Sequence, residues 1–163
     1  MVTATPKVFV RGHMNKYTKD KKILVFENDY AKIVSSDHVS DDMFNNIFIE
    51  EIYDDSYKYF LDLENGLILK DVCSVVNDIV LFLNANTKVL LREFVGRSIV
   101  PIVSVGERVR KSSRLVMIFT GKREVRYGRS NASGIVFYFT QIEYKPQKYL
   151  FVIANDVKVR KIV

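Results

Sequence analysis

Short apolar runs separated by turn residues dominate the hydrophobic pattern of this 163-residue chain. Residues 8–10, 23–26 and 30–34 have the length and the β-branched or aromatic content of short strands. Apolar positions at helical spacing are scarce. The pattern therefore predicts an all-β protein.

Two pairs of apolar runs surround turn-rich segments near the middle of the chain. Residues 57–63 and 67–72 flank Asn65 and Gly66, the dipeptide that tolerates positive φ at both central positions of a type I′ turn. This pair predicts a β-hairpin. The turn-rich residues 84–87 join the runs 75–83 and 89–95.

Only residues 41–53 fit two structures. Ser40 could cap a helix, and Phe44, Ile47, Phe48 and Ile52 fall on one helical face. The same residues are also compatible with a strand. Both alternatives stay open at this point.

The C-terminal half contains two sharp turns and an exposed hairpin. Gly106 and Gly134 stand where the chain must reverse and where a Cβ would hinder positive φ. Residues 115–119 and 135–139 are expected to supply strands of two facing sheets. The polar residues 120–124 between them predict a tight turn, which places Lys122 in solvent.

Four motifs follow one another in this half, in an order typical of one family. They are Val105-Gly106-Glu107-Arg108-Val109-Arg110-Lys111, Leu115-Val116-Met117-Ile118, Thr120-Gly121-Lys122 and Ser133-Gly134-Ile135-Val136. Together they resemble the biotinyl/lipoyl attachment domain. The resemblance implies a barrel-sandwich hybrid fold, with Lys122 in the place of the modified lysine and covalent biotin or lipoate as the cofactor.

The residues around Lys122 differ from both modification signatures. Gly121 and Arg123 replace the Asp and Ala that flank the lipoyl lysine, and neither Met of the biotin signature is present. A second turn and strand at 145–153 echo the family's internal repeat without its glycine. Residues 157–163 are expected to form a last strand outside this module. Over its whole length, the chain resembles a family of small archaeal proteins with a domain of unknown function.

Charge divides the chain into two parts. Residues 1–95 hold 11 Lys/Arg against 15 Asp/Glu, whereas residues 96–163 hold 14 against 4. We therefore predict an acidic β-domain at 1–95 and a basic biotinyl/lipoyl-like β-sandwich at 96–163. Either the basic part meets an anionic partner or the two parts dock on each other.

Eight cations within 22 residues form the strongest candidate binding surface. They are Arg108, Arg110, Lys111, Arg114, Lys122, Arg123, Arg126 and Arg129, opposed only by Glu107 and Glu124. Strand alternation would put many of them on one exposed surface, where Arg suits phosphate contact. Tyr127, Tyr138 and Tyr144 could stack on bases, so RNA or a ribonucleoprotein is the expected partner. A solvated basic face with partly buried tyrosines is the alternative.

Catalytic or metal chemistry has less support in the sequence. His13 and His38 are isolated, so no metal site is expected. Cys73 has apolar neighbours and is expected in the core. Adjacent residues on a strand point apart, which makes the neighbouring carboxylates poor catalytic pairs. They are Asp41 with Asp42, Glu50 with Glu51, and Asp54 with Asp55.

The remaining features indicate the protein's setting. No run approaches 18 apolar residues, the N-terminus lacks the apolar core of a secretory signal, and there is one cysteine. We expect a cytoplasmic protein with no membrane partner, whose exposed strand edges could pair two copies as a homodimer.

These observations favour a non-catalytic binding or scaffold protein with a carrier-like fold. Its basic face would contact a protein, RNA or a ribonucleoprotein, and no cofactor would be needed. The alternative is a carrier of biotin or lipoate modified on Lys122.

Overall fold

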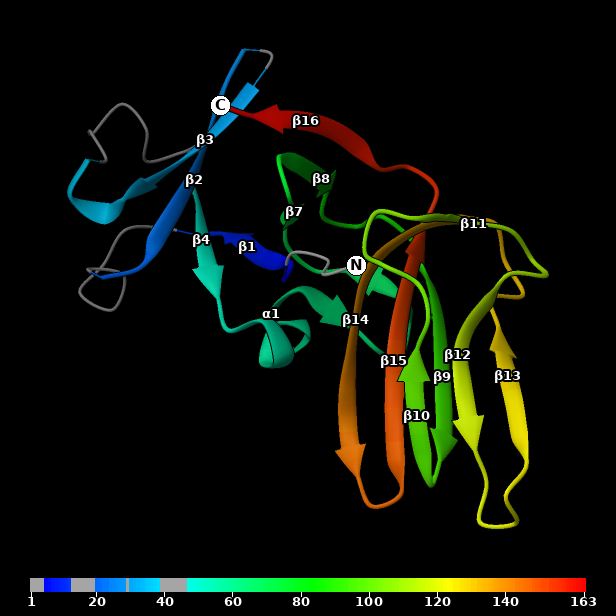
Figure 1. Ribbon diagram of the computed structural model, residues 1–163. Coiled ribbons are helices and arrows are strands. Elements are labelled where there is room, and N and C mark those ends of the chain that lie inside the picture. The colour runs from blue at the N-terminus through cyan, green and yellow to red at the C-terminus, as the bar shows by residue number, and fades with distance from the viewer. Residues whose placement is uncertain (1–4, 13–19, 29, 39–46) are drawn as a thin grey trace. The chain divides into compact units, whose positions relative to one another are not determined.

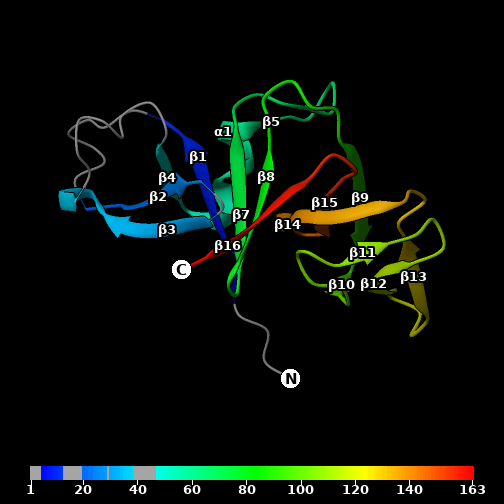
Figure 2. The same cartoon turned by 90° about the horizontal axis from the view of Figure 1, so that it is seen from above.

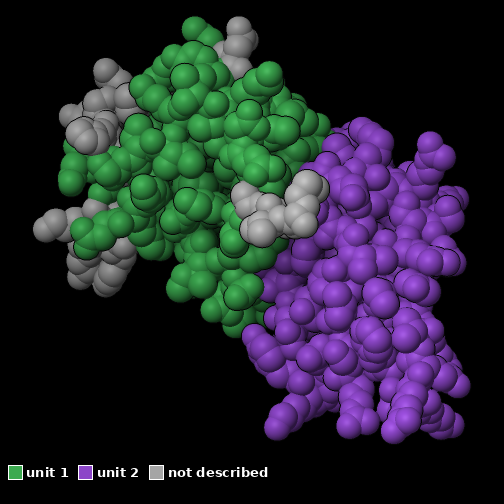
Figure 3. All heavy atoms as spheres, viewed as in Figure 1, with its two compact units in different colours: residues 1–87, 157–163 green, residues 88–156 purple. Residues whose placement is uncertain are grey.

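Nearly every regular element of the chain is a β-strand (Figure 1). The structure is a computed structural model that describes residues 5–12, 20–28, 30–38 and 47–163. It divides into two compact units, coloured separately in Figure 3. Unit 1 comprises residues 1–87 and 157–163, and unit 2 comprises residues 88–156. The predicted predominance of β-structure is confirmed.

Unit 1 is a closed seven-stranded barrel. Its strands are β1 (Lys7–Arg11), β2 (Lys22–Glu27), β3 (Tyr30–Ser35), β4 (Ile47–Glu51), β7 (Val72–Val76), β8 (Ile79–Leu83) and β16 (Lys158–Ile162). Around the barrel the order is β1-β4-β2-β3-β16-β8-β7, with β7 next to β1 again. The C-terminal β16 (red in Figure 2) closes the barrel by pairing with β8 on one side and β3 on the other.

Side chains from all seven strands pack together in the barrel interior. Strand alternation turns Phe9, Leu24, Phe48 and Cys73 into one buried cluster. Ile162 of β16 packs against the same cluster. The last strand therefore contributes to the core as well as to the backbone ladder.

Most of the strands expected in this unit are confirmed. The predicted runs 8–10, 23–26 and 30–34 lie in β1, β2 and β3. In the segment with two alternatives, residues 47–51 form β4, and Tyr53–Asp55 form a 3-10 helix. Residues 39–46, including Ser40 and Phe44, lie outside the described residues.

The hairpin predicted around Asn65 and Gly66 is confirmed, but it is shorter than expected and its turn is not type I′. The preceding run begins with the short helix α1 (Tyr57–Phe60), and only β5 (Leu61–Asp62) and β6 (Leu67–Ile68) pair. Asp62 Oδ1 accepts hydrogen bonds from the amides of Glu64 (3.0 Å) and Asn65 (3.1 Å). These bonds favour a four-residue connection in which only Gly66 has positive φ, 64°.

The run expected at 75–83 is split by a turn. Asn77 adopts a left-handed φ of 55°, which Asn tolerates well, and it lets β7 and β8 pair as a hairpin. The chain then passes through 84–87 into β9 (Leu90–Gly96), which pairs with β15 of unit 2.

Unit 2 contains two sheets. The first has the order β10-β12-β13, with β10 (Ser98–Pro101), β12 (Arg114–Phe119) and β13 (Val125–Arg129). The second has the order β11-β14-β15-β9, with β11 (Arg108–Val109), β14 (Gly134–Tyr144) and β15 (Gln147–Ala154). The strands expected at 115–119 and 135–139 are confirmed, one in each sheet.

One hydrophobic core joins the two sheets of unit 2. It includes Val116 of the first sheet and Phe94, Val136 and Phe151 of the second. Gly128 on β13 faces this core so closely that a Cβ would lie 2.4 Å from the Phe94 ring. Interdigitation across the two inner faces, as in other sheet packings, therefore holds the unit together.

The bounds of the units differ from the predicted parts 1–95 and 96–163. β9 joins unit 2 because it pairs with β15, and β16 joins unit 1 because it pairs with β3 and β8. The expectation of a last strand beyond the carrier-like module is confirmed by β16. No helix among the described residues is long and apolar enough to cross a membrane.

Candidate functional site

The hairpin between β12 and β13 presents Lys122 in solvent. The Thr120 amide donates to the Glu124 carbonyl (3.0 Å), and the Lys122 amide donates to Thr120 Oγ1 (3.3 Å). Arg123 takes a left-handed φ of 61° to complete the reversal. Residues 121–127 are all exposed. The short polar turn and the exposure of Lys122 are confirmed.

A second arginine that the sequence analysis missed lies beside this hairpin. Arg97 Nη1 is 3.7 Å from the position that a Cβ on Gly121 would occupy. Arg97 is exposed and stands between β9 and β10, distant in sequence from the other cations. With Lys122, Arg123 and Arg126 it forms what we call the tip group. The sequence gives little sign of this arginine, because no other Lys or Arg lies within four residues of it.

The other end of the same two strands carries a second set of cations. Arg114 and Arg129 are cross-strand partners, and the Arg114 guanidinium lies 4.0 Å from the centroid of the Tyr127 ring. Arg129 Nη1 donates to the Ser112 carbonyl (2.6 Å). These contacts hold the planar guanidinium groups in fixed orientations.

The turn before β12 adds two cations at this end. The Asn131 amide donates to the Lys111 carbonyl (2.9 Å), which keeps residues 110–113 next to the end of β13. We call Arg110, Lys111, Arg114 and Arg129 the turn group. Arg108 lies apart from β12 and β13, on β11 of the other sheet.

The eight predicted cations therefore do not form one continuous cluster. Arg126 and Arg129, the members of the two groups that are nearest in sequence, are three residue steps apart on β13, or about 10 Å at the usual rise of a strand. Alternation along β13 also places Arg126 on the opposite sheet face from Tyr127 and Arg129. The structure brings Lys122, Arg123 and Arg126 together, and it brings Arg110, Lys111, Arg114 and Arg129 together.

The three tyrosines proposed for stacking have different surroundings. Tyr127 is 41% exposed and Tyr144 is 69% exposed, whereas Tyr138 is fully buried. The prediction for Tyr138 is wrong, because its buried ring is not accessible to a base. Tyr127 is the tyrosine that lies against a predicted cation.

Three side chains that were considered for catalysis are either buried in the core or paired with a lysine. Cys73 is buried in the barrel core as predicted, and burial raises the pKa of its thiol well above the usual value. Glu50 and Glu51 form ion pairs with different lysines, Lys7 (4.0 Å) and Lys21 (3.4 Å). His13 and the pair at 41–42 lie outside the described residues.

Comparison with known proteins places the chain in a family. Its sequence matches the family described as "Uncharacterized protein conserved in archaea (DUF2118)" over residues 3–156. The chain belongs to this archaeal family. The DUF2118 match extends over strands of both units. The predicted archaeal family is confirmed.

One relative is similar over much of its length. The chain is 24% identical over 116 residues to "Uncharacterized protein MJ0859" of Methanocaldococcus jannaschii. The similar region covers 70% of each of the two chains.

Proposed function

We propose that this protein is a non-catalytic binding module whose unit 2 contacts an extended anionic partner, RNA or a ribonucleoprotein. The observation that carries the proposal is the excess of exposed cations in the tip and turn groups. Unit 2 has 13 Lys/Arg against 5 Asp/Glu. Its ion pairs join Arg126 to Glu124 (3.4 Å) and Lys148 to Glu93 (3.2 Å), which leaves most of the positive charge for a partner.

The geometry favours a polyanion over a single small anion. The two groups lie at opposite ends of the β12–β13 ribbon, so one compact ligand would not meet both. Arginine predominates in each group, and its planar fork matches phosphate oxygens. The Tyr127 ring, partly exposed beside Arg114, offers a surface on which a base can stack.

Binding of single-stranded RNA of mixed sequence, followed by fluorescence anisotropy over a salt series, tests this proposal. The Arg123→Ala, Arg126→Ala, Arg129→Ala triple variant should weaken binding. It should also reduce the slope of log K against log salt by about 2, the value for three lost phosphate contacts on a single strand. The matched control removes three exposed lysines of unit 1, Lys22, Lys70 and Lys161. Absence of binding at low salt, or an equal loss in the control, would refute the proposal.

We further infer that unit 2 is a barrel-sandwich hybrid of the biotinyl/lipoyl type. Three features support the inference: the core shared by two sheets, the turn at Gly106 with its φ of 93°, and the exposed hairpin. The Gly106 amide donates to the Val136 carbonyl (2.7 Å), and the Val136 amide donates to the backbone carbonyl of Glu107 (2.9 Å). The first turn is thereby joined to β14, which follows the hairpin.

A carrier modified on Lys122 is the second candidate function. The exposure of this lysine at a hairpin tip favours it, because a ligase must reach the amine. The intact mass of protein purified from its native cell separates the two candidates. An unmodified mass is expected for the binding module. A mass increment of biotin or lipoate that maps to Lys122, and that disappears in Lys122→Arg, would establish the carrier instead.

A further inference from the structure

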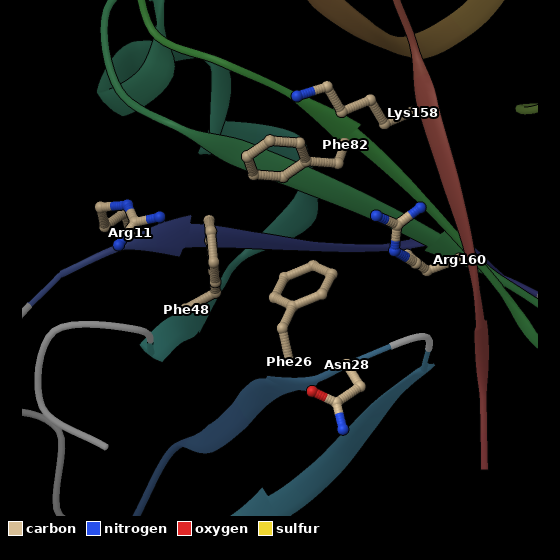
Figure 4. A pocket seen from close by; sticks show the side chains of 7 residues that line it. All are labelled: Arg11, Phe26, Asn28, Phe48, Phe82, Lys158 and Arg160. Carbon is tan, nitrogen blue, oxygen red and sulfur yellow. The ribbon is translucent and has the colours of Figure 1, made fainter. Parts of the chain in front are cut away.

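A pocket of about 310 Å³ opens within the barrel of unit 1 (Figure 4). The strands β1, β2, β4, β8 and β16 all contribute to its lining. The lining residues are Arg11, Phe26, Asn28, Phe48, Phe82, Lys158 and Arg160. The sequence analysis assigned no role to any of them in ligand binding.

Three phenylalanine rings form the apolar part of this pocket. The ring centroids of Phe26 and Phe48 are 5.3 Å apart, and Phe82 lies 5.8 Å from each of them. All three contacts are edge-to-face. Phe48 is almost fully buried, so this aromatic wall is continuous with the barrel core. It offers contact area to a flat apolar group.

Two cations of β16 complete the wall opposite. Ile162 packs against the barrel core, so alternation places Lys158 and Arg160 on the same face of β16, where both line the pocket and stay exposed to solvent. Lys158 Nζ lies 5.8 Å from the Phe82 centroid. Figure 4 shows the phenylalanine rings between Arg11 and these two β16 side chains.

Arg11 has a different environment from the two β16 cations. Its Nε donates to Asp71 Oδ2 (2.7 Å), and its guanidinium lies 4.8 Å from the Phe48 centroid. The carboxylate offsets its charge and holds it against the ring. In the described part of the chain, the lining contains three cations and no carboxylate. Lys158 and Arg160 are therefore the groups that would meet an anion.

This concentration of positive charge is not explained by composition. Unit 1 holds 12 Lys/Arg against 14 Asp/Glu, a net charge of −2. Lys158 and Arg160 are exposed beside the aromatic wall, so an anion that enters the pocket can reach both.

We infer that the barrel pocket binds a small ligand that joins a flat aromatic body to an oxyanion, such as an aromatic carboxylate, sulfonate or phosphate ester. The rings pack against the aromatic body, and Lys158 and Arg160 donate charge-assisted hydrogen bonds to the oxyanion. The pocket volume is at the lower end of the usual range for small-molecule sites, which fits one or two rings. This site is independent of the proposed RNA surface.

A titration of the full chain with naphthalene-1-sulfonate, followed by 1H–15N NMR, tests the inference. Shift changes should cluster around Phe26, Phe48 and Phe82. The Lys158→Gln, Arg160→Gln double variant should weaken binding by about tenfold or more, the usual effect of losing charged hydrogen bonds. Lys161→Gln is the matched control, because it removes one charge from the outward face of the same strand and should bind as the unchanged chain does.

Two analogues separate the parts of the ligand. Neutral 1-naphthalenemethanol should bind more weakly than the sulfonate and should be insensitive to the double variant. Methanesulfonate, which lacks the rings, should not bind measurably. Phe82→Leu should weaken both naphthalene compounds. The inference fails if the sulfonate does not bind, if its shift changes lie elsewhere, or if the double variant leaves its affinity unchanged in a chain that melts normally.

Discussion

The two units of this protein bury similar β-sheet cores but place their cations differently. Unit 1 is slightly acidic, and its last strand turns Lys158 and Arg160 into a pocket. Unit 2 is strongly basic, and the cations of its tip and turn groups are all exposed to solvent. A closed barrel can enclose a pocket in which charged side chains face a small ligand. Two packed sheets have only outer surfaces and edges for their charges, where a large partner can reach them.

The net charge of a segment therefore does not predict where its anion-binding side chains lie in the structure. The division at residue 95 would assign Lys158 and Arg160 to the basic part, beside the RNA surface. The pairing of β16 with β3 and β8 moves them into the acidic unit. Strand pairing, and not composition, decides which kind of anion each cation can meet.

Removal of β16 should produce the largest effect, because it should unfold unit 1 and leave unit 2 folded. A chain ending at Asp156 leaves β3 and β8 without their shared neighbour, so the barrel loses closure and the core loses Ile162. NMR should show collapsed signals for unit 1 and dispersed signals for unit 2, whose strands are all retained. Lys161→Gln, which keeps the strand, is the control. A dispersed unit 1 spectrum after truncation would contradict the role of β16.

A methyl group added in the core of unit 2 should destabilise that unit alone. Gly128→Ala places a Cβ 2.4 Å from the Phe94 ring, and such overpacking costs about 1–3 kcal/mol. Gly121→Ala on the same hairpin is the matched control, because its nearest neighbour is Arg97 Nη1 at 3.7 Å. Urea unfolding monitored on unit 2 resonances measures both. Equal unfolding free energies would show that Gly128 does not face the core as described.

The thiol of Cys73 should report opening of the barrel alone, since unit 2 contains no cysteine. Burial both blocks the sulfur and raises its pKa, so a disulfide reagent at pH 8 should react at least about a thousandfold more slowly than in urea. The chain truncated after Asp156 should lose this protection, and Gly128→Ala should keep it. Fast labelling of the intact chain would place Cys73 outside a stable core.

The smallest effect is expected at Asp62 in the β5–β6 connection of unit 1. Hydrogen bonds from the Asn65 side chain and from nearby amides lower the pKa of Asp62. Its stabilising contribution is therefore present above the pKa of the unfolded chain, about 3.9, and is lost as the pH falls through the lower folded value. Melting curves from pH 7 to pH 2 should show that Asp62→Ala lowers unit 1 stability near neutrality and converges with the unchanged chain in acid. A constant difference at all pH values would contradict this account.

Local patterns in the sequence were sufficient for many individual elements. The runs of β1, β2, β3 and β12 are short and rich in β-branched residues, and such segments form strands in most contexts. The polar turn carrying Lys122 was predictable for the same reason, because turn chemistry depends on a few adjacent residues. The burial of Cys73 followed from its apolar neighbours.

Contacts between residues far apart in sequence decided the rest. β9 and β16 lie near the predicted boundary and the chain end, yet each belongs to the unit in which it finds hydrogen-bonding partners. Arg97 reaches the tip group only through the pairing of β10 with β12, in which Ser98 is the partner of Phe119. The Lys158-Val159-Arg160-Lys161 segment has the composition of a surface strand, and only barrel closure places two of its cations beside the aromatic pocket. A sequence determines which residues can form a strand, but its partners and its inner face depend on the whole set of backbone pairings and on the core that they enclose.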